Sequence, residues 1–282
     1  MNNNKTKHIE IAPYNPNWPQ MFEAEAAQIT KALGNNLIAI HHIGSTSVPG
    51  LVAKPIIDII VVVRHGATTI KNLETLGFVH KGEYNIPMRF FFSRSHGIAT
   101  NLHVYEDDNP QIELNLLFRD YLRSHSDAIR EYAEIKQNLL QDPASFELKN
   151  SKFSGYTLGK DAFIRKILQE TGFDKLRLMR CAHYAEWDTY HRICEEQILK
   201  PLNIIYNRNH PHLTAENHFH FVLYKGVEIV SVAHVEFLND NEAALRSLAT
   251  DEPYKNHGFG KAMMGLLEKW IEHHGRKLII DN

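Results

Sequence analysis

The run KPIIDIIVVV at residues 54–63 constrains the fold of this chain more than any other segment. Its apolar positions are nearly continuous and mostly β-branched, which is typical of a central strand buried on both faces of a sheet. Residues 36–43 indicate a neighbouring strand, and residues 18–33 place Phe22, Ile29 and Leu33 on one stripe of a helix. The first half of the chain is therefore expected to form a mixed sheet covered by helices.

A second series of predicted strands and helices starts after a short hinge at residues 173–178. Residues 218–238 indicate a hairpin around Gly226, residues 242–250 a further strand, and residues 258–275 a long helix that begins at glycines. A chain of 282 residues normally holds two domains, at about 100–200 residues each. We expect an α+β protein with domains at 1–172 and 176–282.

Composition and charge indicate an ordinary globular protein, with 43% hydrophobic and 23% charged residues and a net charge of −2. That charge provides no global basic field for nucleic acid or an anionic membrane. Cys181 and Cys194 lack CxxC spacing, which fits a reducing compartment. The N-terminus lacks the apolar core of a signal peptide, and the longest apolar run is too short to span a bilayer. The expected location is the cytoplasm.

The first candidate site is the loop GSTSVPG, which begins with Gly44 and Ser45. Asp58 lies inside the following apolar strand, where a carboxylate is costly unless a cation or hydrogen-bond donors compensate it. One arrangement places a phosphate on the loop amides and a metal on Asp58, with Lys54 adding charge. The alternative is a tight turn whose hydroxyls bond the backbone, with Asp58 paired to an arginine such as Arg89.

Five segments then carry a family resemblance: HIGSTSVPGLVAKPIIDI, NLHVYE, LLFRDYLRSH, EYAEIK and YTLGKDAFI. In this order, over about residues 8–172, they resemble the GrpB family, which is similar to polymerase-beta-like nucleotidyltransferases. The resemblance implies that Gly44 and Ser45 hold a nucleotide triphosphate. It also implies that Asp58 is the catalytic carboxylate and binds magnesium.

The chain departs from the wider superfamily pattern at the second carboxylate position, where Ile60 stands. Two-metal transfer uses at least two bridging carboxylates, and Glu106 is the further metal ligand that we expect. The other residues expected to line the nucleotide pocket are Lys54, Arg89, His103, Arg119 and Lys160. The alternative for His103, Arg119 and Lys160 is that each is a polar residue on a helix surface, or one whose hydrogen bonds are made within the core.

The second candidate site is the loop Lys255–Lys261, which lies between a strand and a long helix. Gly258 and Gly260 allow a ligand to approach the backbone closely, and the free amides of the first helical turn favour an anion. Lys255 and Lys261 add positive charge. A pyrophosphate is the ligand that these features favour together.

The segment KNHGFG resembles motif A of the GNAT acetyltransferases, whose general form is Q/R-x-x-G-x-G/A, and the match covers about residues 176–282. Lys255 stands at the usual arginine or glutamine position, which keeps a charge but loses the planar fork. The resemblance implies that acetyl-CoA is the cofactor, with its pantetheine arm along Leu248–Thr250. The residues implied to bind it are Leu248, Thr250, Lys255, Asn256, His257, Gly258, Phe259, Gly260 and Lys261.

The C-terminal segment KLIIDN ends where a GNAT fold needs another helix and further strands. We therefore expect a shortened domain, or one completed by a second subunit in a homodimer. Glu236, with His234 two residues before it on the same strand face, is the candidate general base for the amine. The alternative for both is a solvent-facing strand residue.

Two histidine pairs, His210/His212 and His218/His220, would each point to one face if they lie on strands. They indicate either a metal site, for which spacing supplies no third ligand, or polar faces of half-exposed strands.

The leading functional hypothesis is N-acetyl transfer from acetyl-CoA to an amine. The alternatives are magnesium-dependent nucleotidyl transfer by the first domain and non-catalytic binding of a nucleotide or CoA.

Overall fold

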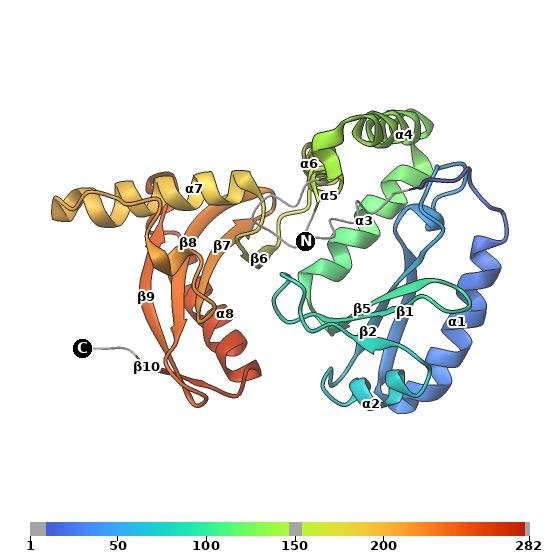
Figure 1. Cartoon of the computed structure of the whole chain (residues 1–282), viewed down its shortest axis with the longest axis horizontal. Coiled ribbons are helices and arrows are strands. Elements are labelled where there is room, and N and C mark those ends of the chain that lie inside the picture. Colours follow the sequence, from blue (N-terminus) through green and yellow to red (C-terminus); the bar gives the residue numbers. More distant parts are fainter. Residues whose placement is uncertain (1–9, 147–153, 280–282) are drawn as a thin grey trace, which may run out of the picture. The chain divides into compact units, whose positions relative to one another are not determined.

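The computed structural model describes residues 10–146 and 154–279, and these fall into two compact units (Figure 1). The first unit holds residues 10–84 and 89–173, and the second holds residues 174–279 with the short segment 85–88. None of the helices in the described ranges is long and apolar enough to cross a bilayer.

The first unit is built on a five-stranded mixed sheet of order β1-β2-β5-β4-β3. Its strands are β1 (Leu37–Ile43), β2 (Ile57–Val63), β3 (Val79–His80), β4 (Phe90–Arg94) and β5 (Thr100–Glu106). β2 pairs antiparallel with β1 and parallel with β5. Every β2 residue except Asp58 is buried, so residues 57–63 of the predicted run 54–63 form an inner strand, and the strand starts three residues later than predicted.

Helices cover the sheet of the first unit (Figure 1). They are α1 (Trp18–Leu33), α2 (Thr69–Glu74), α3 (Pro110–Ser124), α4 (Ser126–Gln141), α5 (Gly155–Leu158) and α6 (Asp161–Glu170). One core packs the odd-numbered β2 side chains against α1 and α2. A second core joins α3, α4 and α6 to the loop after β1.

The second unit is a five-stranded sheet of order β10-β9-β8-β7-β6. Its strands are β6 (Leu176–Arg180), β7 (His218–Lys225), β8 (Glu228–Phe237), β9 (Glu242–Thr250) and β10 (Lys277–Ile279), and β9 and β10 are parallel. The helix α8 (Phe259–His273) packs on one face and α7 (Tyr184–Cys194) on the other (Figure 1). Two mixed sheets with helices confirm the expected α+β class.

Candidate functional sites

Asp58 lies at the start of β2 and faces away from the core that α1 forms with the sheet. Its Oδ1 accepts a hydrogen bond from Asn101 Nδ2 at 2.9 Å and lies 3.7 Å from His103 Nε2. Both partners come from β5, where alternation puts positions 101 and 103 on the same face as Asp58. The Asp58 side chain remains 29% exposed, so a ligand can reach it.

The orientation of His103 is set by the buried Arg89. Arg89 Nη1 donates to His103 Nδ1 at 3.2 Å, so the neutral ring carries its proton on Nε2, toward Asp58. Burial lowers the pKa of His103 and favours this neutral form. Arg89 therefore acts on Asp58 through the imidazole, in place of the direct arginine–carboxylate pair weighed from the sequence.

Gly44 brings the loop after β1 against Asp58. Its φ is +67°, and a Cβ at this position would lie 2.7 Å from Asp58 Oδ2. Ser47 Oγ donates to the Gly44 carbonyl at 2.6 Å and closes a 3₁₀ turn over Ser45–Ser47. A glycine is required here both by the backbone conformation and by the close approach of the carboxylate.

Lys136 of α4 reaches into the same loop, and sequence reasoning missed it. The side chain is 2% exposed, and its Nζ donates to Ser45 Oγ at 2.6 Å and to Val52 O at 2.8 Å. The same Nζ lies 4.5 Å from the centroid of the Tyr132 ring. The available signal was a lysine at the i, i+4, i+8 positions of a buried stripe with Ala128 and Tyr132.

Two further lysines, Lys54 and Lys160, both contact the ring of Tyr156 on α5. The Nζ atoms of Lys54 and Lys160 lie 4.6 and 4.7 Å from the centroid of the Tyr156 ring. Burial, assisted by the neighbouring lysines and opposed by Asp58, lowers the pKa of Lys136 to about 7 and that of Lys160 to about 8. A partly buried group of ammonium ions favours an anionic ligand. We call Lys54, Lys136 and Lys160 the lysine cluster.

The expectation that Glu106 joins Asp58 as a metal ligand is wrong. Asp58 pairs with Asn101, whereas Glu106 pairs with Val63 at the other end of β2, about 16 Å away at 3.3 Å per residue. Glu106 also points to the opposite sheet face, where its Oε1 accepts from Gly66 N at 2.8 Å. No three His, Cys, Asp or Glu side chains of the described ranges form a metal-binding group. Magnesium is therefore not supported at Asp58.

Arg119 makes its contacts elsewhere on the first unit. Its Nη1 donates to His42 O at 3.1 Å, and its Nε donates to Asp120 at 2.7 Å. Among the hydrogen bonds and ion pairs of the described residues, none links Arg119 to Asp58. Its role in binding a nucleotide stays a prediction.

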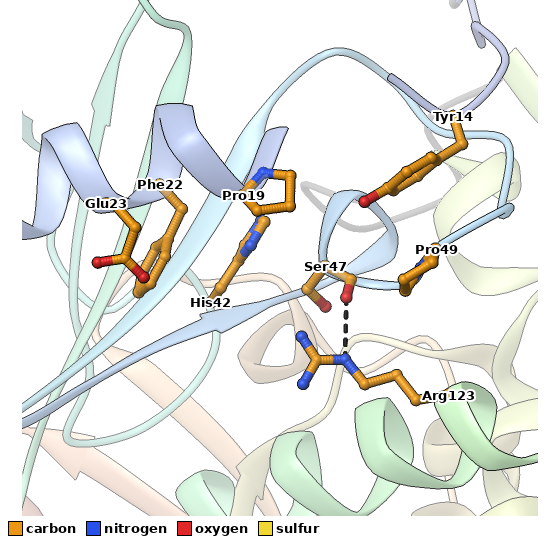
Figure 2. A pocket seen from close by; sticks show the side chains of 8 residues that line it. All are labelled: Tyr14, Pro19, Phe22, Glu23, His42, Ser47, Pro49 and Arg123. Carbon is orange, nitrogen blue, oxygen red and sulfur yellow. Dashed lines mark hydrogen bonds between the residues drawn. The ribbon is translucent and has the colours of Figure 1, made fainter. Parts of the chain in front are cut away.

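A cavity of about 370 Å³ lies beside the same loop, between α1 and α3. Figure 2 shows its lining residues: Tyr14, Pro19, Phe22, Glu23, His42, Ser47, Pro49 and Arg123. Arg123 Nε donates to the Ser47 carbonyl at 3.0 Å and fixes the loop from the α3 side. The His42 ring stacks on Phe22, and burial lowers its pKa to about 4. The cavity thus presents a neutral aromatic wall, the guanidinium of Arg123 and the carboxylate of Glu23.

In the second unit, the predicted glycine loop leads into a helix. Gly258 takes φ +81° and is the N-cap of α8, so it offers no side chain to the amides of the first turn. Gly260 lies in that turn, where a Cβ would meet Leu248 Cδ2 and Thr250 Oγ1, each at 3.5 Å. Leu248 and Thr250 at the end of β9 therefore adjoin the helix N-terminus, and their role in binding a cofactor stays a prediction.

Side chains of this loop form an ion pair and a hydrogen bond with neighbouring residues of the loop. Lys255 Nζ pairs with Glu252 at 2.5 Å, and His257 Nδ1 bonds the Lys255 carbonyl at 2.8 Å. Asp251, before the loop, accepts both Nη atoms of Arg192 from α7 at 2.9 and 2.7 Å, and this arginine lowers the pKa of Asp251. A ligand anion would have to compete with Glu252 for Lys255, whereas Asn256, Phe259 and Lys261 lie beside the helix start.

A β-bulge interrupts the pairing of β8 and β9. The register moves from His234 opposite Ser247 to Val235 opposite Leu245, so Arg246 is an extra residue on β9. Bulges locally disrupt the ladder and are frequent beside active sites. This one lies two residues before Leu248.

Glu236 is close to this bulge, and its carboxylate is paired with the guanidinium of Arg246. Arg246 Nε donates to it at 2.7 Å, and this bond lowers the pKa of Glu236. His218 Nδ1 and His234 Nε2 are 2.7 Å apart, and His218 Nε2 lies 3.7 Å from Glu236 Oε1. Glu236, His218 and His234 are therefore connected, and Glu236 by itself is a weak base.

The histidine pairs differ from one another in structure. His218 and His220 lie on β7, as the strand alternative requires, but His210 and His212 belong to a 3₁₀ turn at Pro211–Leu213. Proline in this segment prevents regular strand pairing. The ring of His212 nevertheless lies 4.7 Å from that of His234.

Known proteins match the two units separately. The family model described as GrpB protein matches residues 8–170, more than half of the chain. The chain belongs to the GrpB family. Its GrpB part is 39% identical to the UPF0157 protein YqkA of Bacillus subtilis over 56% of this chain, and 38% identical to the UPF0157 protein BH1888 of Halalkalibacterium halodurans over 47%. The aligned region spans 46% of YqkA and 70% of BH1888.

A solved structure agrees with the GrpB assignment. The conserved protein GrpB from Enterococcus faecalis is 34% identical, and the match covers 57% of this chain and 96% of that one with a TM-score of 0.51. The acetyltransferase (GNAT) family model matches residues 177–281. The chain thus joins a GrpB domain to a GNAT domain, as the sequence resemblances predicted.

Proposed function

We propose that the protein is an N-acetyltransferase that uses acetyl-CoA and carries the reaction in its GNAT domain. The observation that carries this proposal is the start of α8, where Gly258 at φ +81° leaves the amides of the first turn without a side-chain cap. Such a helix start binds a pyrophosphate through its N–H groups and its dipole. The GNAT family match of residues 177–281 supports the same ligand.

The bulge next to this helix start supports an acyl-transfer reaction. The pantetheine arm would lie along Leu248–Thr250, which brings the thioester toward the disrupted ladder at Arg246. A backbone donor there would stabilise the oxyanion as the amine nitrogen bonds to the carbonyl carbon and the C–S bond breaks. The ammonium proton would pass to the His234–His218 pair, and Glu236 beside His218 Nε2 would remain a carboxylate, because its bond from Arg246 keeps its pKa low.

Calorimetry with CoA tests this proposal. Wild-type protein should bind CoA, and Gly258→Val should lose binding, because valine is strained at φ +81° and its side chain would project from the helix start. Lys255→Ala should weaken binding mildly, since this exposed lysine is shared with Glu252, and added salt should weaken wild-type binding. Equal CoA affinity in wild type and Gly258→Val would reduce the loop to a strand-to-helix turn.

A second candidate function is recognition of a phosphate-bearing ligand by the GrpB domain, favoured by the lysine cluster around Ser45. Nucleotide binding through this cluster would need no magnesium, because ammonium ions would supply the countercharge. Thermal shift with ATP, GTP and inorganic phosphate, each with and without magnesium, tests this. Stabilisation that requires magnesium would instead favour the nucleotidyltransferase alternative.

A further inference from the structure

Ser45 and Lys136 form a contact that could also transfer a proton, a chemistry that neither proposed function uses. We propose that Ser45 is a nucleophile with Lys136 as its general base, so that the GrpB domain takes up an acyl group from a small ester on Ser45 Oγ. The two atoms are 2.6 Å apart, within the range for proton transfer between a nucleophile and its base. Pairs of serine and lysine that act in this way are a known variant of the catalytic triad.

The surroundings of Lys136 orient it for this role. Its Nζ donates to the Val52 carbonyl at 2.8 Å, which leaves the lone pair of the neutral amine available to the Ser45 hydroxyl. Lys136 is 2% exposed, whereas Ser45 is half-buried. The nucleophile, its base and a group that orients the base are therefore all present.

Several charged and aromatic groups control the protonation of Lys136. Burial is the main factor, Lys160 and Lys54 also lower the pKa, and Asp58 raises it, with the resulting pKa at about 7. The Tyr132 ring packs against the ammonium on its own helix. This lowered pKa favours the neutral amine that a general base must be.

The proposed reaction step is a balanced acyl transfer. Ser45 Oγ attacks the carbonyl carbon of the ester, and its proton passes to Lys136 Nζ. The tetrahedral intermediate then expels the alcohol oxygen, which takes the proton back from Lys136. The products are an ester on Ser45 and a free alcohol, and Lys160 in the same cluster would stabilise the oxyanion.

Covalent labelling of the full-length protein tests this role. With diisopropyl fluorophosphate, Ser45 Oγ should displace fluoride, and with p-nitrophenyl acetate it should gain an acetyl group, both located by intact mass and peptide mapping. Ser45→Ala should abolish the labels at this peptide. Lys136→Met should slow labelling by about 10²-fold or more, the usual contribution of a general base.

Matched controls separate this role from general reactivity. Ser124→Ala and Lys166→Met change an exposed serine on α3 and a surface lysine that pairs with Glu131, so both should label at the wild-type rate. A label on a residue other than Ser45, or no label on Ser45 between pH 6 and 9, would overturn the proposal. So would a folded Lys136→Met variant that labels at the wild-type rate.

The pH dependence gives a second readout that does not depend on the stability of Lys136→Met. The wild-type labelling rate should rise with pH around a midpoint near 7, as Lys136 loses its proton. Asp58→Asn should move this midpoint to lower pH, because Asp58 raises the pKa, and Lys160→Met should move it to higher pH. Midpoints that are unchanged in both variants would contradict the base role. Labelling needs no CoA, so its outcome is independent of the acetyltransferase proposal.

Discussion

At the scale of single residues, the close contact between Gly44 and Asp58 connects the loop after β1 to the polar face of the sheet. The cost of placing the Asp58 carboxylate in an apolar strand is reduced by the neighbouring polar groups of Asn101 and His103 and by the access of its side chain to water. The absent Cβ of Gly44 provides the space for Asp58 Oδ2. Any substitution that adds a side chain at Gly44 must therefore move the carboxylate or the loop.

Gly44→Ala is predicted to destabilise the first unit by more than the strain of φ +67° alone. That strain is worth about 1–2 kcal/mol for an L-residue, and the added Cβ would also lie 2.7 Å from Asp58 Oδ2. Gly50→Ala is the control, because Gly50 has φ +82° and open space around a Cβ. Urea unfolding of the two variants measures the difference. Equal losses would show that the contact with Asp58 costs nothing.

At the scale of elements, β7 and β8 bring several neutral imidazoles together. His220 bonds the Tyr190 hydroxyl at 2.8 Å and the His212 carbonyl at 3.1 Å, and its ring lies 4.4 Å from that of His234. Burial lowers the pKa of His220 to about 4, and it lowers the pKa of His234 as well. The hairpin is therefore folded around histidines in their uncharged state.

The second unit is predicted to lose stability as the pH falls from 6.5 to about 4. In that window the unfolded chain binds a proton at His220 and the folded chain does not, so His220 alone lowers the free energy of unfolding by about 1.4 kcal/mol per pH unit. Above pH 6.5 both states are neutral and this effect vanishes. His220→Gln should make the slope shallower.

Urea unfolding followed by tryptophan fluorescence measures this slope. In a Trp18→Phe background the signal comes from Trp187 and Trp270, both in the second unit. A slope that is the same with and without His220 would remove this residue as its source. His257→Gln is the control, because that ring lies exposed in the loop before α8.

At the scale of the whole molecule, each unit has its own core and its own candidate site. Large side chains such as Phe92 in the first unit and Trp270 in the second are fully buried within separate clusters. In the second unit β10 stands at the edge of the sheet, with β9 as its partner in the described part of the chain. Such an edge is a surface for pairing with another chain.

The edge at β10 leads to a prediction of self-association into a dimer. Sedimentation velocity at increasing protein concentration should show a species of twice the monomer mass. Added charge on edge strands opposes pairing, so Leu278→Lys should shift the equilibrium toward monomer, and Lys225→Gln on β7 should not. A monomer at all concentrations would reject the prediction.

The local elements and both family resemblances follow from the order of the residues alone. The β-branched run at 54–63 predicted a buried strand, found at 57–63, and the glycines at 258 and 260 marked the start of α8. Such signals can be read from the sequence because they depend on residues that are close together in the chain. The tertiary structure decided which distant side chains meet. Lys136 Nζ bonds Ser45 Oγ although the two residues are 91 positions apart in the sequence. Glu106 lies on β5, which pairs with the strand of Asp58, but at the opposite end of the pairing and therefore far from Asp58. Strand register and the sheet face fix such contacts, and both depend on the packing of the entire unit.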